Sequence, residues 1–285
     1  MHDLGPLLYT AEWLAAHPTP ATVIADVRWY LDGRSGRAAY EADHIPGAIF
    51  VDIDTDLSAK GRPASDGRHP LPDPHAFAAT LARLGIGPND VVVAYDDSGG
   101  GTAGRFVWML RAIGRTAGLL DGGLNAWTAD HETGENHRPA QSPAPAAPWP
   151  ARQLATYGDV SDVPSRTETV LIDARAKDRY LGDVGLGDAR AGHIPGAISL
   201  HWTRALDPST GRFRAAEQLR DLFAEEGITA ATDVIASCGS GVSACADLVA
   251  LELAFGHPAR LFVPSFSGWS SEAARTVETG PPQGP

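Results

Sequence analysis

The chain of 285 residues carries one set of landmarks twice, in the same order. The hexapeptide HIPGAI begins at His44 and again at His193, an offset of 149 residues. Upstream of each copy an apolar run ends in Asp-x-Arg, and these two runs, VIADVR and VLIDAR, are 147 residues apart. Downstream, each half has a tryptophan motif, at Trp127 and at Trp269. Landmarks that keep their order and nearly their spacing indicate an internal duplication.

Each half alternates short apolar runs with helical patterns. The runs are rich in Val, Ile and Leu, as expected for strands buried in a parallel sheet; in the first half they lie at 22–27, 48–53, 91–95 and 117–120. One helix is predicted over 75–85 and another over 217–227, and each ends at a glycine. Their apolar faces consist of Phe77, Leu81 and Leu84 and of Leu219, Leu222 and Phe223. Repeated strand–helix units predict an α/β fold, with a mostly parallel sheet covered by helices on both faces in each half.

A proline-rich stretch, RPAQSPAPAAPWP, lies between the two halves. It has few groups able to pack in a core, so we expect an extended and rather stiff connector. We therefore predict a first domain over 1–137, a linker over 138–151 and a second domain over 152–285.

The net charge of −12 argues against nonspecific nucleic-acid binding, which requires a basic face. A small anionic substrate remains compatible, because a local cluster of arginines can reverse the field inside a cleft. No run of 18 apolar residues is present and the N-terminus lacks the pattern of a secretion signal, so we expect neither a membrane span nor export. Two cysteines without zinc-ligand spacing predict no disulfide framework and no metal site. We expect a reducing, cytoplasmic setting.

Cys238 stands at the end of the apolar run DVIAS and opens a loop with two glycines. A helical pattern, SACADLVALELAFG, follows this loop. Small residues let successive backbone N–H groups turn inward, and the helix N-terminus adds partial positive charge, so a thiol here should lose its proton readily. Cys245 lies inside the apolar helix pattern and is interpreted as packing. The duplication aligns Asp96 of the first half with Cys238 of the second.

The segment CGSGVSA, from Cys238 to Ala244, resembles the active-site loop of the two-domain rhodanese family of sulfurtransferases. It is most similar to the 3-mercaptopyruvate sulfurtransferase branch, whose loop reads C-G-S-G-V-T-A, with Ser243 here in place of Thr. The repeated HIPGA, the Asp-x-Arg strand ends and the tryptophan motifs add to the resemblance, which covers about residues 5–277. It implies two tandem rhodanese-like domains.

The resemblance also implies a mechanism. The thiolate of the catalytic cysteine takes sulfur from a small anionic donor, becomes a persulfide and passes that sulfur to a thiol or cyanide, or to a thioredoxin-like protein. No cofactor or metal is required. The first domain has Asp96 at the cysteine position and is expected to be catalytically silent. The loop residues assigned to catalysis are Cys238, Gly239, Ser240, Gly241, Val242 and Ser243.

The nature of the donor is predicted from the loop and from two arginines. The thiosulfate-preferring branch has Arg-Lys directly after its cysteine, whereas Gly239 and Ser240 are uncharged here. 3-Mercaptopyruvate carries one carboxylate, which one or two arginines can bind bidentately. The resemblance assigns the first of these to Arg179; the second normally lies in a P-E-P-R segment that this chain lacks, and Arg190 is the candidate to replace it. Surface or interdomain salt bridges are the alternative for both.

The 3-mercaptopyruvate branch is assigned a Ser-His-Asp relay shared between its domains. The matching positions are Ser240, His69 in GRHPLP and Asp54 in VDID, and histidine suits proton transfer near neutral pH. Trp29 matches a first-domain aromatic residue that faces the active site in the family. A solvated histidine, a turn-capping aspartate and ordinary packing are the respective alternatives.

Other functions are less compatible with the residues. A Cdc25-like phosphatase needs C-x5-R, but the sixth residue after the cysteine is Ala244. The first-half sequences DSGGG and GGGTAGR lack a serine-protease context and the P-loop G-K-[ST]. A thiosulfate sulfurtransferase and a noncatalytic sulfur-sensing module remain as alternatives. We predict a higher kcat/KM for 3-mercaptopyruvate than for thiosulfate.

Overall fold

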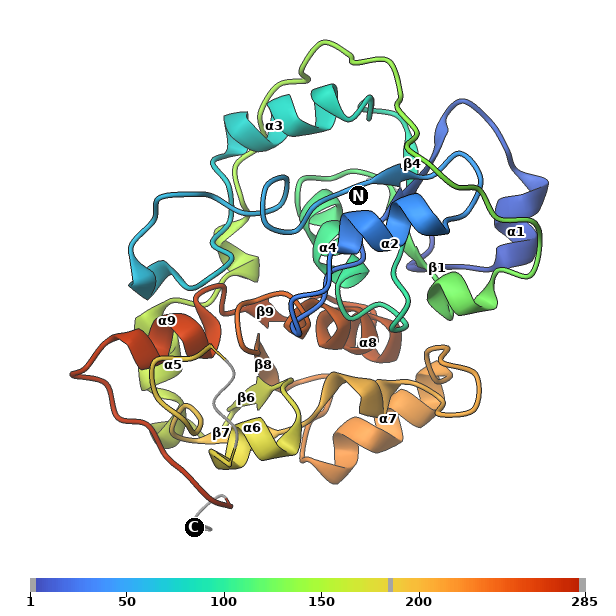
Figure 1. The fold of residues 1–285 in the computed structure, drawn as a ribbon. Coiled ribbons are helices and arrows are strands. Elements are labelled where there is room, and N and C mark those ends of the chain that lie inside the picture. Colours follow the sequence, from blue (N-terminus) through green and yellow to red (C-terminus); the bar gives the residue numbers. More distant parts are fainter. Residues whose placement is uncertain (1–3, 184–186, 282–285) are drawn as a thin grey trace. The chain divides into compact units, whose positions relative to one another are not determined.

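The structure is a computed structural model that describes residues 4–183 and 187–281. The chain divides into two compact units (Figure 1). The first comprises the chain up to Lys60, Leu71–Pro150 and Leu206–Phe213; the second comprises Gly61–Pro70, Ala151–Ala205 and the chain from Arg214 onward. Each unit thus includes a short segment from the other half of the sequence. The predicted domain boundaries stay a prediction, and the compact units differ from them in these two segments.

A parallel five-stranded sheet forms the centre of the first unit, in the order β1-β5-β4-β2-β3. Its longest pairing joins β2 and β4, in register from Thr22 opposite Val91 to Asp26 opposite Tyr95. The strands are β1 (Leu8–Tyr9), β2 (Thr22–Asp26), β3 (Ile49–Phe50), β4 (Val91–Tyr95) and β5 (Ala117–Leu120). The carboxyl ends of β2 and β4 therefore lie side by side, where parallel sheets place their functional loops.

The strand predicted over 48–53 is shorter in the structure, and that prediction was wrong in its length. The chain turns after β3 because the Asp52 carboxylate accepts hydrogen bonds from the amides of Asp54 (2.7 Å) and Thr55 (3.0 Å). The hydrophobic run alone does not show that the Asp52 side chain competes with a neighbouring strand for these backbone amides. The other three predicted strands are present, with ends within one residue of the prediction.

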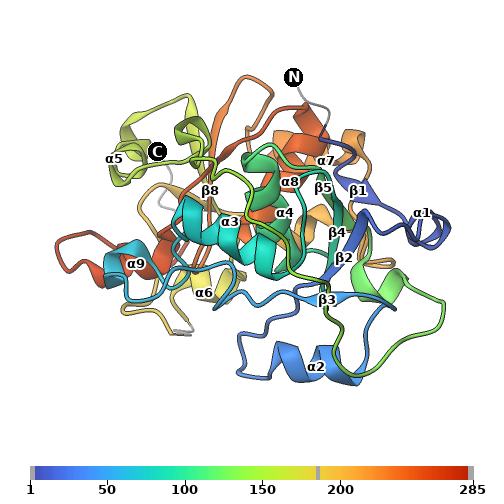
Figure 2. The ribbon, with the colours of Figure 1, turned by 90° about the horizontal axis from the view of Figure 1, so that it is seen from above.

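Helices cover both faces of this sheet (Figure 2). Residues of α1 and α2 pack with Val93 and Tyr95 of β4 on one face, and α3 and α4 lie on the other. The helix predicted over 75–85 is confirmed as α3, which begins after Asp73, whose carboxylate accepts from the amide of His75 (2.8 Å). The bounds are α1 (Ala11–Ala16), α2 (Gly36–Ala42), α3 (Pro74–Arg83) and α4 (Ala103–Ala112).

The second unit repeats this plan with a parallel four-stranded sheet in the order β7-β6-β8-β9. That order matches β3-β2-β4-β5 of the first unit, as the duplication predicts. The strands are β6 (Thr169–Asp173), β7 (Ala197–Ser199), β8 (Asp233–Ser237) and β9 (Arg260–Leu261). The helices are α5 (Tyr157–Ser161), α6 (Lys177–Leu181), α7 (Ala216–Glu225), α8 (Ala244–Phe255) and α9 (Ser265–Ser271). The predicted fold class, an α/β fold with a parallel sheet in each half, is confirmed.

The helix predicted over 217–227 is confirmed as α7. Its Leu219 and Phe223 are fully buried, and α7 packs along α8 (Figure 1). Apart from Asp247 and Glu252, α8 is apolar, and most of its residues are buried, which is the expected character of a central helix. This helix carries the residues that follow the Cys238 loop.

The duplicated HIPG motif forms the same structure in both units. His44 stacks on Tyr40 with ring centroids 4.2 Å apart, and His193 stacks on Tyr180 at 3.8 Å. Each histidine also places Nδ1 at hydrogen-bond distance from the carbonyl oxygen of the tyrosine on which it stacks, at 2.7 and 2.9 Å. Both histidines are buried, so they stabilise the connection into β3 and β7.

The duplicated Asp-x-Arg motif forms a buried ion pair at the end of β2 and of β6. Arg28 donates to both carboxylate oxygens of Asp26, and Arg175 donates to both oxygens of Asp173. Each arginine also donates to a carbonyl oxygen further along the chain, Asp43 or Gly192. These contacts give Arg28 and Arg175 a structural role at the ends of β2 and β6.

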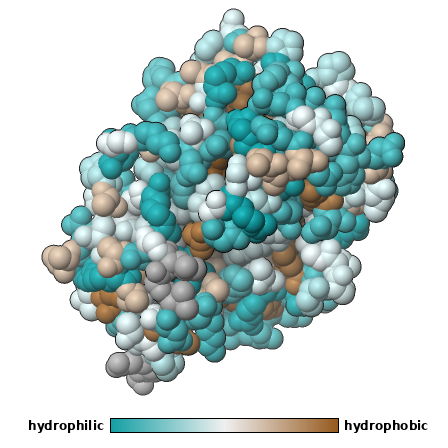
Figure 3. All heavy atoms as spheres, viewed as in Figure 1, coloured by the Kyte–Doolittle hydropathy of each residue, from teal (hydrophilic) through white to brown (hydrophobic). Residues whose placement is uncertain are grey.

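Polar side chains make up most of the face seen in Figure 3, with small scattered hydrophobic patches. Among the residues that the structure describes, Leu31 is the one large hydrophobic side chain classed as exposed, at 46%. No helix within the described ranges combines the length and the apolar character that a membrane crossing requires.

Candidate active site

Cys238 directly follows β8, at the carboxyl end of a central strand. Its side chain is buried, with 2% exposure, and the amide of Gly241 donates to Sγ at 3.1 Å. The loop backbone is held on its far side because Cys238 O and Gly239 O accept from the amides of Phe266 and Ser267, both at 2.9 Å. The thiol thus sits inside a rigid loop in front of α8, as the sequence predicted.

Ser265 holds the start of this loop and is the one non-glycine residue with positive φ (50°) among the described residues. Its Oγ accepts from the amide of Cys238 (3.2 Å) and donates to the carbonyl of Phe262 (2.9 Å). The matching residue of the first half is Gly123, which also has positive φ (61°). A serine in this sparsely populated conformation supplies a hydroxyl that glycine cannot, so backbone strain is tolerated where it fixes the cysteine.

The first unit shows what the duplicated loop is built to hold. One carboxylate oxygen of Asp96 accepts from the amides of Ser98 (2.9 Å) and Gly100 (2.8 Å). The other accepts from the amides of Thr102 and Ala103, both at 2.8 Å. Four backbone donors around one buried carboxylate form an anion nest. The residues of the second unit that match Ser98, Gly100 and Thr102 are Ser240, Val242 and Ala244.

His69 and Ser240 lie together in the second unit. Nδ1 of His69 is 2.8 Å from Oγ of Ser240, and both side chains are buried. They are 171 residues apart in the sequence and meet because the segment Gly61–Pro70 belongs to this unit. Two members of the predicted relay are therefore in direct contact, and one of them, Ser240, directly follows Gly239 in the loop.

Asp54 and Trp29 belong to the first unit, where they contact each other. The indole nitrogen of Trp29 donates to Oδ2 of Asp54 at 3.0 Å. Both residues are predicted site residues, each by its own match to the family. Their part in the site stays a prediction.

Arg179, on α6, lies beside the loop as the resemblance implied. A Cβ atom added to Gly239 would be 3.0 Å from a terminal nitrogen of Arg179, so the guanidinium reaches the loop backbone. The same group donates to Oδ2 of Asp188 at 2.7 Å. The side chain of Asp188 is only 2% exposed.

Arg190 has a different set of partners from the one predicted. Its Nε donates to the carbonyl oxygen of Ser270 (2.9 Å), and its terminal nitrogens donate to the carbonyl oxygens of Arg275 (2.7 Å) and Glu272 (2.8 Å). All three guanidinium nitrogens thus hold the chain at and beyond the end of α9. This geometry gives Arg190 a structural task, and its predicted role in substrate binding finds no support in these contacts.

Asp247 is a buried acid on α8, nine residues after the cysteine. Burial raises the pKa of Asp247 well above its usual range, and the nearby Cys238 and Asp173 raise it further. Its Oδ2 has no hydrogen-bond partner among the described residues, which suits a neutral acid. The matching residue of the first unit is a buried arginine, Arg105, nine residues after Asp96. The two loops therefore stand before side chains of opposite chemical character.

Three residues beside the loop were not identified from the sequence: Arg68, Asp188 and Ser265. Arg68 precedes His69 in GRHPLP, and a Cβ atom added to Gly239 would be 2.9 Å from its NH2 nitrogen. Asp188 lies two residues before Arg190, in GLGDAR. The proximity of Arg68 to His69 and of Asp188 to Arg190 in the sequence could have pointed to these two residues. No sequence pattern pointed to Ser265.

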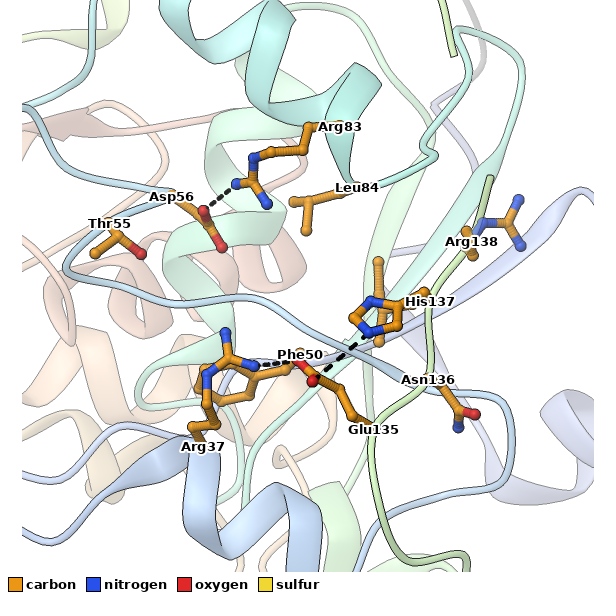
Figure 4. A pocket seen from close by; sticks show the side chains of 11 residues that line it. Arg37, Phe50, Thr55, Asp56, Arg83, Leu84, Glu135, Asn136, His137 and Arg138 are labelled. Carbon is orange, nitrogen blue, oxygen red and sulfur yellow. Dashed lines mark hydrogen bonds and ion pairs between the residues drawn. The ribbon is translucent and has the colours of Figure 1, made fainter. Parts of the chain in front are cut away.

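A separate polar pocket lies in the first unit (Figure 4). Its cations are already paired with acids, since Arg37 contacts Glu135 and Arg83 contacts Asp56. No group of three or more His, Cys, Asp or Glu side chains in the described part of the chain is arranged to hold a metal ion. The predicted absence of metals and cofactors stays a prediction.

The chain belongs to the rhodanese family, because the rhodanese-like domain matches residues 10–130 and 156–272. A probable 3-mercaptopyruvate sulfurtransferase of Pseudomonas aeruginosa is 40% identical, over 96% of this chain and 98% of that protein. A putative thiosulfate sulfurtransferase of Mycobacterium tuberculosis, SseB, is 37% identical, over 98% of this chain and 99% of that protein. With such relatives over nearly its whole length, the chain is a sulfurtransferase, as the sequence predicted.

The crystal structure of SseA, a 3-mercaptopyruvate sulfurtransferase from Escherichia coli, has the same fold. It matches with a TM-score of 0.80 at 30% sequence identity, over 92% of this chain and 99% of SseA. The predicted pair of tandem rhodanese-like domains is thereby confirmed.

Proposed function

We propose that this sulfurtransferase moves a sulfur atom from 3-mercaptopyruvate, through a persulfide on Cys238, to a thiol or cyanide acceptor. The names of several relatives support the donor, among them the Pseudomonas aeruginosa protein and the human 3-mercaptopyruvate sulfurtransferase, which is 35% identical over 84% of this chain. The uncharged Gly239 and Ser240 support a donor with a single carboxylate.

The observation that best supports the persulfide is the set of hydrogen bonds that the Asp96 carboxylate accepts in the duplicated loop. Its oxygens stand two bonds from Cβ, the same separation that the outer sulfur of a cysteine persulfide has. Backbone amides donate to both oxygens at 2.8–2.9 Å. A persulfide anion on Cys238 would place its outer sulfur near the amides of Ser240, Val242 and Ala244, which match Ser98, Gly100 and Thr102, so the loop suits the proposed intermediate as well as the thiol that Gly241 contacts.

The chemistry balances without a redox partner. The Cys238 thiolate attacks the sulfur of 3-mercaptopyruvate; an S–S bond forms, the C–S bond breaks, and its electron pair leaves on carbon as the enolate of pyruvate. The proton of the donor's thiol is transferred to that carbon, pyruvate departs, and the persulfide remains as its anion. An acceptor thiolate or cyanide then attacks the outer sulfur, and the S–S electron pair returns to Cys238 as the thiolate.

The His69–Ser240 pair is placed to handle the proton of the first step. A hydroxyl bonded to an imidazole can donate a hydrogen bond to the developing enolate and be reprotonated from the ring. Their contact of 2.8 Å beside the loop supports this role. Ser240 would touch the substrate, and His69 would act through it.

Thiosulfate is the second candidate donor. The guanidinium groups of Arg68 and Arg179 approach Gly239, so positive charge stands beside the loop although the loop itself is uncharged. The name of the Mycobacterium tuberculosis relative also favours it.

A steady-state comparison of the two donors tests the proposal. We expect a higher kcat/KM with 3-mercaptopyruvate, and intact-mass measurement should show one extra sulfur atom after donor is added without acceptor. Cys238→Ala should fold and lose sulfur loading from both donors. A higher kcat/KM with thiosulfate would overturn the proposed donor, and sulfur loading that survives Cys238→Ala would overturn the proposed intermediate. Loading without turnover by any acceptor would instead favour the sulfur-sensing alternative.

A reducing compartment such as the cytoplasm suits this chemistry, because Cys238 must be a free thiol. Both cysteines are free and buried in the structure. A thioredoxin-like protein is a fitting acceptor because its exposed thiolate can attack the outer sulfur.

A further inference from the structure

Asp247 places an acid in the apolar helix that follows the Cys238 loop. The other charged residue of α8, Glu252, is only partly buried, whereas Asp247 is 2% exposed. A carboxyl group is seldom buried so deeply without a cation beside it. Among the described residues, no ion pair of Asp247 is present, so packing and charge balance do not account for an acid at this position.

The geometry of the helix directs this side chain toward the loop. Asp247 follows the first residue of α8, Ala244, by three positions, so its Cα lies only about 4.5 Å further along the helix axis. The Cα–Cβ bonds of an α-helix tilt toward its N-terminus, which is the end that the Cys238 loop precedes. The electrostatic influence of Cys238 on Asp247 agrees with this placement.

The surroundings of Asp247 favour its neutral form. Its Oδ2 accepts no hydrogen bond from any described residue. Burial raises the pKa of Asp247 well above its usual range, and negative charge on Cys238 and Asp173 raises it further. The cation beside Asp173, Arg175, already donates to both oxygens of that carboxylate. Asp247 therefore keeps its proton at pH values at which an ordinary aspartate has lost it.

The charged side chains of the other elements packed on α8 have partners of their own or lie in solvent. Arg220 of α7 donates to the carbonyl oxygen of Ala254, at the far end of α8, at 3.1 Å. The other cations are paired with acids: Arg204 with Glu225 and Glu226, and Arg260 with Asp233. The remaining acids of α7 are exposed: Glu217 and Asp221. Asp247 thus lies near one ionisable group that takes part in the reaction, Cys238.

We propose that Asp247 is a positioning residue that makes sulfur delivery from Cys238 depend on pH. While Asp247 keeps its proton, the loop has to stabilise only the charge on sulfur, to which the Gly241 amide donates at 3.1 Å. Once Asp247 is ionised, two like charges lie close together in a poorly solvated place, and each destabilises the other.

The effect on the reaction follows from the leaving group. When an acceptor takes the outer sulfur, Cys238 leaves as a thiolate, and a thiolate that is less stable leaves more slowly. Ionised Asp247 should therefore slow sulfur delivery. This step rests on the proposed persulfide, whereas the coupling between the proton of Asp247 and the charge of Cys238 does not.

Sulfur delivery from the loaded enzyme tests the proposal. Wild type and Asp247→Asn, each carrying one extra sulfur, are mixed with excess cyanide in a single turnover at a series of pH values. The ratio of the two rates at each pH cancels the titration of cyanide itself. Because asparagine cannot ionise, the variant should gain about 3- to 10-fold over the wild type between neutral and alkaline pH. Asp221→Asn, which neutralises an exposed acid on α7, is the matched control and should keep a constant ratio.

The carboxyl group of Asp247 gives a second readout, which needs neither donor nor acceptor. An infrared difference spectrum between the wild type and Asp247→Asn isolates the band of the protonated carboxyl, which is followed as the pH rises. Coupling between two sites is reciprocal, so in Cys238→Ala the band should disappear at lower pH than in the wild type. The difference for Cys238→Ala is taken against the double variant, and a thermal melt of each protein checks that it folds.

The outcomes separate this inference from the proposed function. A delivery ratio that stays constant with pH, or that changes equally in Asp221→Asn, would overturn the role of Asp247. A carboxyl band with the same pH dependence in Cys238→Ala and in the wild type would overturn the coupling. If Cys238 takes up no sulfur, the proposed function fails, and the infrared titration still decides whether the two groups are coupled.

Discussion

The contact between His69 and Ser240 predicts energetic coupling between two residues from opposite halves of the sequence. Both are buried, and the 2.8 Å contact is well within hydrogen-bond range. Ser240→Ala removes the partner of a buried imidazole nitrogen, which should cost about 1–3 kcal/mol of unfolding free energy. His69→Ala removes the same bond together with ring packing and should cost at least as much. Because the bond can be lost only once, the double variant should cost about 1 kcal/mol less than the sum of the single variants.

The same comparison of single and double variants applies to catalysis. If Ser240 delivers a proton supplied by His69, each single variant should lower kcat/KM for 3-mercaptopyruvate by about 100-fold or more. The double variant should lose little beyond the larger single loss, because the two residues act as a unit.

Urea unfolding and steady-state kinetics on the four proteins measure both couplings. Ser161→Ala is the matched control, since this exposed hydroxyl on α5 bonds only the carbonyl of Tyr157 and the guanidinium of Arg275 in the described contacts. It should change stability by less than about 0.5 kcal/mol. Additive stability losses would show that the contact is not an effective hydrogen bond, and multiplicative kinetic losses would refute the relay.

Three further results are expected. In urea unfolding, Asp247→Asn should be more stable than the wild type at pH 7 and similarly stable near pH 4. Because the pKa of Asp247 is raised in the folded protein, the folded chain keeps a proton that the unfolded chain releases. The stability of the wild type therefore falls as the pH rises above the pKa of an unfolded aspartate, about 3.9. A variant less stable at pH 7 would contradict this sign. Gly241→Ala should cost about 1–3 kcal/mol and slow alkylation of Cys238, because φ is 74° and the added Cβ would be 2.7 Å from the Val263 carbonyl oxygen; a neutral effect would show that the loop can relax. Asp96→Ala should destabilise the first unit by about 3 kcal/mol or more in hydrogen-exchange measurements, since four amides lose their acceptor; unchanged protection of these amides would argue against an anion nest.

Local pattern predicted the fold and the position of the thiol. The duplication anticipated the matching strand orders, and the apolar run before Cys238 anticipated the buried strand that presents it. These features depend on residues that are neighbours in the chain, so a sequence shows them directly. The length of β3 was not predicted correctly because the Asp52 side chain accepts hydrogen bonds from backbone amides that a longer strand would use.

The groups around the thiol could be predicted only in part. Arg68 and Asp188 are 120 residues apart, and no periodicity links them. The partners of Arg190 are distant in the same way, since they lie about 80 residues further on, where the chain leaves α9, and its role in substrate binding stays a prediction. Polar contacts between distant parts of the chain depend on tertiary packing. A sequence motif predicts them only where the same contacts are known from a related protein.

The segment Gly61–Pro70 has a consequence for how such a chain can evolve. It belongs to the unit that carries Cys238, and it supplies His69 and Arg68 to that unit's loop. The half of the sequence that begins at Ala151 therefore contains the thiol, Ser240 and Arg179 but lacks His69 and Arg68. Removal of the first half of the sequence would therefore also remove two side chains that contact or approach the Cys238 loop of the second unit. A first half without a cysteine of its own can thus be required for the structure around the cysteine of the second.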